Sequence, residues 1–106
     1  MIVSDNVRIA EGIAHKAPEI LASIKKKKKP SYRFWYGVTT GLGPESLMYI
    51  ISSEEYLLPV YRDDSLKLLG LAGSRQEACE IVTGIVKEGC DAHRISDMKQ
   101  FIEEIY

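Results

Sequence analysis

The sequence has few of the features that mark secreted or membrane-embedded proteins. It contains only two cysteines, Cys79 and Cys90. If both lie on one helix, as argued below, about 16 Å separates their Cα atoms, whereas a disulfide needs about 7 Å or less. Reduced thiols are typical of a cytosolic protein. No apolar run approaches the roughly 20 residues of a membrane-spanning helix, and the charged first residues do not form a secretory signal. We therefore expect a cytoplasmic protein with no membrane partner.

Patterns that carry enzyme chemistry are also missing. Zinc sites usually combine two pairs of ligands at fixed spacing, and the chain has only His15 and His93 beside its two cysteines. The loop of residues 39–46 lacks the third glycine of a dinucleotide fingerprint and the Gly-Lys-Ser/Thr ending of a P-loop. Asp64 and Lys67 do not form the acid-x-lysine pair of restriction-endonuclease-like nucleases, because two residues separate them. We predict no cofactor and no metal site. An enzyme is less favoured than an interaction module or a nucleic-acid-binding protein.

What is present is the composition of one ordinary globular domain spanning residues 1–106. Apolar residues make up 45% of the chain and charged residues 27%, close to the averages for folded proteins. The net charge is −1 but unevenly spread. Residues 1–40 carry eight Lys and Arg against three acids, a balance of +5, and residues 41–106 carry six against twelve, a balance of −6. This asymmetry favours either an anionic partner for the basic half or attraction between the two halves.

The first half of the chain predicts a helix and then a strand. Ser4 and Asp5 are good helix starters, and a stripe of apolar residues follows at steps of three and four: Ala10, Ile13, Ala14, Ala17, Leu21 and Ile24. Because the stripe keeps its phase through Pro18, we predict one kinked helix rather than two. Aromatic and β-branched residues then predict a strand over Tyr32 to Thr39.

Further along, Leu47 to Ile51 has the length of a second strand. Ser65 to Ala72 is apolar on both faces apart from Lys67, as a central strand would be. Ser52 and Glu55 match a capping box, so a short helix is expected before Pro59 stops it.

Two helices are predicted to close the chain. Ser74 and Glu77 form the clearest capping box, and Gly89 suits the residue after that helix. Asp97 can cap the last helix, whose apolar face is Met98, Phe101, Ile102 and Ile105. The predicted fold is α+β: a small three-stranded sheet packed with N- and C-terminal helices, in the order α-β-β-(α)-β-α-α. The predicted core comprises Leu66, Leu68, Leu69, Ile81, Val82 and Ile85.

The most conspicuous candidate site is basic. The lysine run, Lys25, Lys26, Lys27, Lys28 and Lys29, is followed by Tyr32, Arg33 and Trp35. Cations that track phosphates and aromatics that stack on bases are the ingredients of a surface for single-stranded nucleic acid. The alternative is that the lysines only complement a helix C-terminus and keep it solvated. A pI of about 6.1, far below the value of about 9 seen in dedicated binders, favours this alternative.

A second candidate site lies between the predicted central strand and the best helix. There Ser74 and Arg75 bring free amides and a cation to a helix N-terminus, where anions bind readily. Against this interpretation, Ser74 and Glu77 are already explained as caps, and Glu77 adds negative charge. Cys90 and His93 are also close in sequence, but a spacing of this kind does not establish the geometry of nucleophilic catalysis.

The segments VRIAEGI, YLLPVYR and LLGLAGSRQEACEIV resemble small uncharacterised bacterial proteins of about this length. Those proteins share an N-terminal amphipathic helix, a Tyr-Arg before the central strand and a Gly-x-Ala turn into a helix. The resemblance covers most of the chain and implies a standalone bacterial protein, without implying any activity.

Two functions therefore remain from the sequence. The first is a non-catalytic interaction or regulatory module that self-associates, with a protein partner or a second copy of itself. Unpaired strand edges and many aromatics favour a two-fold homodimer, in which Trp35 or Tyr36 could pack into the neighbouring molecule. The second is a nucleic-acid-binding protein that uses Lys25 to Lys29 and the nearby aromatics.

Overall fold

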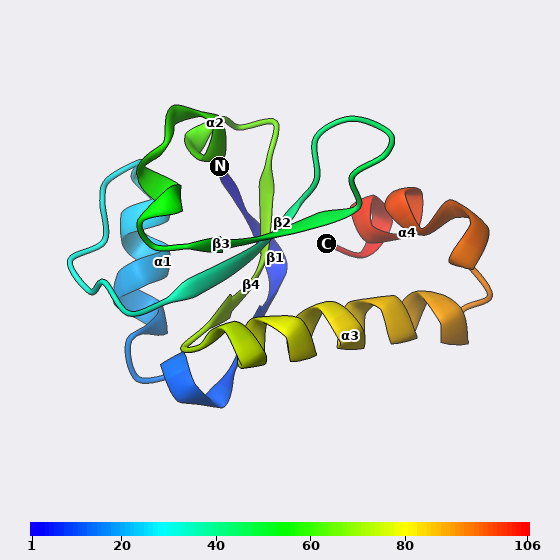
Figure 1. Ribbon diagram of the computed structural model, residues 1–106, viewed down its shortest axis with the longest axis horizontal. Helices are drawn as coiled ribbons and strands as arrows, with labels where there is room; N and C mark the ends of the chain where they lie inside the picture. Colours follow the sequence, from blue (N-terminus) through cyan, green and yellow to red (C-terminus); the bar gives the residue numbers. More distant parts are fainter.

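The computed structural model describes residues 1–106 and arranges them in three layers, with a four-stranded sheet between helices (Figure 1). The strands are β1 (Ile2–Ile9), β2 (Tyr36–Thr40), β3 (Met48–Ser52) and β4 (Lys67–Ala72). The helices are α1 (Ala17–Lys25), α2 (Pro59–Arg62), α3 (Arg75–Asp91) and α4 (Met98–Ile105). Three short 3-10 turns, η1 (Glu11–Ile13), η2 (Glu55–Leu57) and η3 (Ile95–Asp97), complete the path. The predicted α+β class is confirmed.

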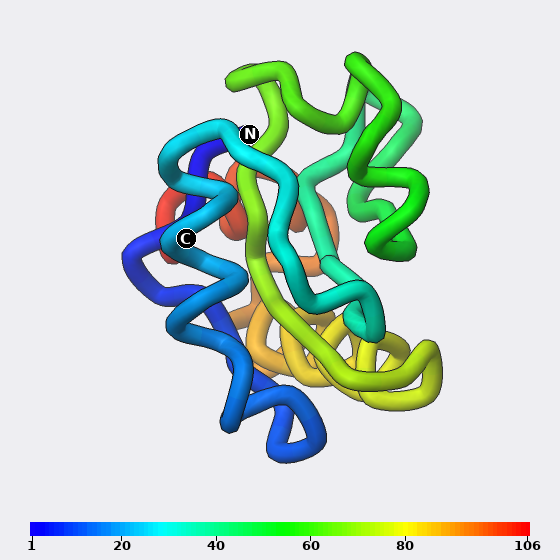
Figure 2. The backbone as a smooth tube through the Cα atoms, turned by 90° about the vertical axis from the view of Figure 1, so that its left-hand side faces the viewer, coloured from blue at the N-terminus to red at the C-terminus, as the bar shows by residue number.

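The sheet is mixed, in the order β1-β4-β2-β3. β1 runs parallel to β4, whereas β2 is antiparallel to both β4 and β3. Figure 2 views the molecule from the side of α1, with α3 behind the strands. The predicted central strand is therefore confirmed as β4, which lies between β1 and β2. The predicted number of three strands is wrong, because the sheet has a fourth strand, β1.

The fourth strand, β1, replaces the first part of the predicted N-terminal helix. Ser4 does not cap a helix: its hydroxyl donates to the carbonyl of Tyr106 at 2.7 Å and accepts from the amide of Asn6 at 3.1 Å. The helix α1 begins only at Ala17, and Pro18 lies in its first turn, where a missing N–H costs nothing. Pro18 therefore helps to start α1 instead of kinking a longer helix.

β1 is an irregular edge strand held by the end of α4. Val3 pairs with Leu68 and Arg8 pairs with Gly70. The segment of β1 between these two pairs is longer than the matching segment of β4, so β1 bulges there. Arg8 Nε donates to the hydroxyl of Tyr106 at 2.8 Å, and that hydroxyl donates to Glu88 at 2.6 Å. These contacts tie the bulged segment to α3 and to the residue after α4.

A bulge also shapes the central strand. Val38 and Thr39 of β2 pair with Gly70 and Leu68, which leaves Leu69 as an extra residue in β4. A Cβ on Gly70 would lie 2.7 Å from Ile81 Cγ2, closer than such contacts normally allow. The glycine therefore lets α3 pack tightly against the middle of the sheet.

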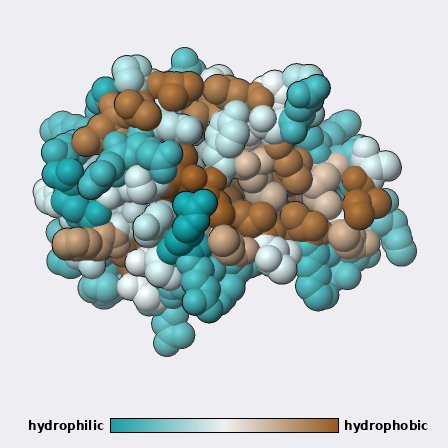
Figure 3. All heavy atoms as spheres, viewed as in Figure 1, coloured by the Kyte–Doolittle hydropathy of each residue, from teal (hydrophilic) through white to brown (hydrophobic).

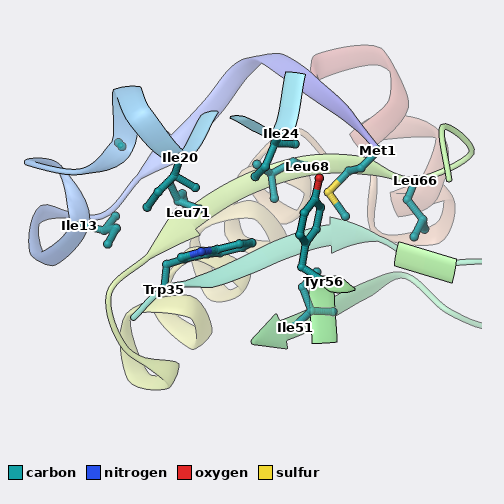
Figure 4. Close-up of a cluster of buried hydrophobic side chains, with 11 residues drawn as sticks. Met1, Ile13, Ile20, Ile24, Trp35, Ile51, Tyr56, Leu66, Leu68 and Leu71 are labelled. Atoms are coloured by element: carbon teal, nitrogen blue, oxygen red, sulfur yellow. The ribbon is translucent and has the colours of Figure 1, made fainter. Parts of the chain in front are cut away.

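Two hydrophobic clusters fill the two sides of the sheet. On the side of α1 lie Met1, Ile13, Ala17, Ile20, Ile24, Trp35, Ile51, Tyr56, Leu66, Leu68 and Leu71, most of them labelled in Figure 4. On the side of α3 and α4 lie Val38, Leu69, Ala72, Ala78, Ile81, Ile85, Met98, Phe101, Ile102 and Tyr106. Of the six predicted core residues, five are buried, and Val82 is half-buried. No helix in the structure is both long enough and apolar enough to cross a bilayer.

The helix ends differ in part from their sequence signals. The Ser52–Glu55 capping box is confirmed, because the amide of Ser52 donates to Glu55 Oε1 and the amide of Glu55 to Ser52 Oγ. The short helix predicted before Pro59 is the 3-10 turn η2, which ends at Leu57, and Pro59 then starts α2. Gly89 does not end α3, which continues to Asp91. Asp97 makes no capping hydrogen bond and instead pairs with Arg94.

Candidate interaction surfaces

The lysine run wraps around the C-terminal end of α1. Lys27 has the left-handed φ of 58°. The amide of Lys28 donates to Ser23 O at 2.8 Å and the amide of Lys27 to Ile24 O at 3.0 Å, the bonding pattern of a Schellman motif. The five side chains are exposed, and α1 ends at the first of them. The run therefore forms a solvated helix end.

One lysine of the run is already paired. Lys27 Nζ donates to Asp64 Oδ2 at 2.7 Å. This hydrogen bond raises the pKa of Lys27 and lowers the pKa of Asp64. Both groups are largely in solvent, where a pair of this kind contributes little to stability. The contact does, however, place a carboxylate against the middle of the run, where it would repel a phosphate.

The aromatic side chains after the run do not form a stacking platform. The predicted strand begins at Tyr36, so residues 32–35 are irregular and do not alternate between two faces. Trp35 is 1% exposed and lies between α1 and the sheet (Figure 4), with its ring centroid 5.6 Å from that of Tyr56. The prediction that Trp35 reaches a base or a neighbouring molecule is therefore wrong. Phe34, at 75% exposed, and the half-buried Tyr32 lie edge to face beside the exposed Arg33.

The N-terminus of α3 binds a carboxylate of the chain itself. Ser74 accepts the amide of Glu77 at 3.1 Å, as predicted for a cap. The carboxylate of Glu77 accepts hydrogen bonds from the amides of Gly73, at 2.8 Å, and Gly12, at 2.9 Å. Glu77 thus occupies the amide that an anion beside Ser74 and Arg75 would use. It also joins α3 to η1, the turn that precedes α1, whereas the lysine run follows the other end of α1.

The loop between β2 and β3 has the polarity of a cation site, and a lysine fills it. Lys99 Nζ donates to the carbonyls of Gly41 at 3.2 Å, Gly43 at 2.8 Å and Ser46 at 2.8 Å. An ammonium has three donors, so all three are used. A phosphate-binding loop would instead direct amides inward. The sequence showed the glycines of this loop but gave no signal for Lys99, which comes from α4.

Sequence reasoning also missed a groove of about 410 Å³ at the end of the sheet where β2 begins and β3 and β4 end. Its lining residues are Arg33, Phe34, Trp35, Tyr36, Ser52, Ser53, Glu54 and Gly73. The lining carries one cation and one carboxylate and has no group of three or more potential metal ligands. Cys79 and Cys90 are free and exposed on α3, away from this lining.

β3 is the edge strand opposite to β1, and its main chain is free on the outer side. The amide of Gly41 donates to Leu47 O and that of Ser53 to Trp35 O, both at 3.0 Å. Because main-chain groups alternate in direction along an antiparallel pair, every second residue of β3 points its N–H and C=O away from β2. These residues are Met48, Ile50 and Ser52, and the N–H of Ser52 is held by Glu55 at 3.0 Å.

The side chains of this edge are apolar. Met48 and Ile50 are half-buried and pack against the cluster on the α3 side, next to the half-buried Val82 and Val86. Figure 3 shows apolar side chains gathered on this face between β3 and α3. The strand contains no charge, no proline and no bulge, the features that usually protect an exposed edge. β1, by contrast, is bulged and carries Asp5 and Arg8.

Comparison with known proteins places the chain in no established group. The resemblance to small bacterial proteins therefore rests on the three sequence segments alone. The expected amphipathic helix of those proteins corresponds here to β1, η1 and α1 in succession. No known family, curated protein or solved structure matches this chain.

Proposed function

We propose that the protein is a non-catalytic interaction or regulatory module of the cytoplasm that self-associates. The observation that carries the proposal is the unprotected β3 edge, where Met48 and Ile50 turn apolar side chains to one face and free main-chain groups outward. An edge of this kind is a template for pairing with another strand. Because only one of the two sheet edges is open, pairing would end at two copies and would not continue into a filament.

Sedimentation of the purified protein tests self-association. At tens of micromolar we expect a reversible dimer of twice the chain mass of 11.9 kDa, whose proportion falls on dilution. Two-fold dimers are the commonest soluble oligomers. A single 11.9 kDa species that does not change with concentration would overturn the proposal.

The second candidate function, nucleic-acid binding, is favoured by the exposed lysine run beside Arg33 and Phe34. Two observations weigh against it: the burial of Trp35, and the carboxylate of Asp64 that contacts Lys27 of the run. We therefore expect no measurable binding of single-stranded oligonucleotides at physiological salt.

A salt titration distinguishes the two functions. If the run neutralises phosphates, affinity falls steeply with salt because counterions are released. Replacing Lys25, Lys26, Lys28 and Lys29 with Gln, while keeping the Asp64 contact of Lys27, would then flatten the dependence. Lys87→Gln, an exposed lysine on α3, is the matched control. A salt-sensitive micromolar complex that is lost only in the lysine-run variant would establish nucleic-acid binding.

A further inference from the structure

We propose that two copies of the chain pair β3 with β3 in antiparallel register, with the two-fold axis passing between Ile50 and Ile50 of the partner subunit. The two sheets then form one continuous sheet of eight strands. This inference rests on the proposed self-association and adds the surface, the register and the symmetry.

The register follows from which residues face outward. In an antiparallel pair, residues that exchange hydrogen bonds lie directly opposite each other, and in β3 only Met48, Ile50 and Ser52 have outward main-chain groups. An axis at Ile50 places Ile50 opposite its own copy and Met48 opposite the partner's Ser52, so the whole strand is paired. An axis at Tyr49 or Ile51 would leave one end of β3 unpaired.

The side chains are self-complementary in this register. On the α3 face, Ile50 meets the partner's Ile50 and Met48 meets the partner's Ser52. On the α1 face, Tyr49 meets the partner's Ile51. No charged side chain lies opposite another, and aromatic and β-branched cross-strand pairs of this kind stabilise sheets. The half-buried Val82 and Val86 of α3 lie beside the same edge, so the partner would extend the apolar cluster on that side.

The far edge of the sheet explains why the occupant is a second copy in a closed pair. β1 is bulged, carries Asp5 and Arg8, and is tied to the end of α4 by Ser4 and Asn6. A strand cannot add there without breaking these contacts. At the β3 edge, Glu55 already holds the N–H of Ser52. The interface hydrogen bonds are therefore those exchanged by Ile50 and its copy at the axis, and those from the amide of Met48 to the carbonyl of the partner's Ser52 on either side of it.

Disulfide cross-linking tests the register. In a Cys79→Ser, Cys90→Ser background, Met48→Cys and Ser52→Cys are made separately. Opposed residues in a hydrogen-bonded pair lie about 5.5 Å apart, within disulfide range, whereas two copies of residue 48 lie about 14 Å apart, four residues along the strand. We expect efficient oxidation of the mixed variants to a heterodimer and none of either variant alone. Cross-linking of one variant with itself, in a protein that sediments as a dimer, would overturn this register.

A charge placed at the axis tests the surface. Ile50→Lys sets two ammonium groups opposite each other and should raise the dimer dissociation constant about tenfold or more. Ile2→Lys, on the exposed side of β1, is the matched control and should leave the constant unchanged. If only Ile2→Lys lost the dimer, self-association would stand but the interface would be the β1 edge. Absence of a dimer in the unmodified protein would remove both proposals.

Discussion

Replacing Trp35 with alanine should lower the free energy of unfolding by about 3–5 kcal/mol, the usual cost of truncating a buried aromatic side chain. The indole is 1% exposed and lies among the side chains of α1 and the sheet. Its six-membered ring also lies over Gly37, where a Cβ would be 3.4 Å from Trp35 Cζ3. Equilibrium unfolding in urea, followed by far-ultraviolet circular dichroism, measures the loss, since the variant has no tryptophan left to report by fluorescence.

Two further variants separate burial from other roles of this segment. The indole Nε1 of Trp35 is buried and has no hydrogen-bond partner, so Trp35→Phe removes volume but no hydrogen bond, and it should cost clearly less than Trp35→Ala because the cavity is smaller. Phe34→Ala removes a neighbouring aromatic that is 75% exposed and should change stability by about 0.5 kcal/mol at most. A loss below about 1 kcal/mol in Trp35→Ala would show that the indole is not part of the core and would reopen its use as a stacking surface.

The elements that the sequence predicted well carry a clear signal in their own residues. Ser52 and Glu55 cap each other across three residues, and both predicted bonds form. β4 was recognisable because it is apolar on both faces, which follows directly from its place in the middle of the sheet. The face of α3 was likewise evident from its stripe, with Ile81 and Ile85 buried.

β1 could not be predicted in this way, because what stabilises it lies far along the chain. Ser4 and Asp5 have the local preference of a helix start, but the strand pairs with β4, and Ser4 binds Tyr106. Long-range pairing outweighs a local preference that is worth about 1 kcal/mol. The same applies to Glu77, whose capping position was predicted while its carboxylate instead joins Gly12 to Gly73.

The candidate surfaces also include some features that the sequence predicts and others that it does not. That the sheet has open edges could be predicted from the number of strands, but which edge is protected could not, because the bulge in β1 and its contacts with α4 leave no mark in composition. The cradle around Lys99 is built from backbone carbonyls, which every residue possesses. Its polarity therefore depends on the path of the loop and not on the residue types in it.

Truncating Ile85 to alanine should lower the free energy of unfolding by about 2–5 kcal/mol. Ile85 is fully buried and belongs to the cluster that joins α3 to the sheet and to α4. α4 has only eight residues, too few to be stable as an isolated helix, so it depends on this cluster for its position. The cavity left by the missing methyl groups therefore weakens two contacts of α3 at once.

Glu80→Ala is the matched control for Ile85→Ala. Glu80 lies on the same helix and is exposed, so its replacement keeps the helix propensity and removes no buried surface; stability should stay within about 0.5 kcal/mol. Urea unfolding of both variants, with Trp35 fluorescence as the common signal, gives the comparison directly. If Ile85→Ala lost less than about 1 kcal/mol, or no more than Glu80→Ala, the buried face of α3 would have to be different from the one described.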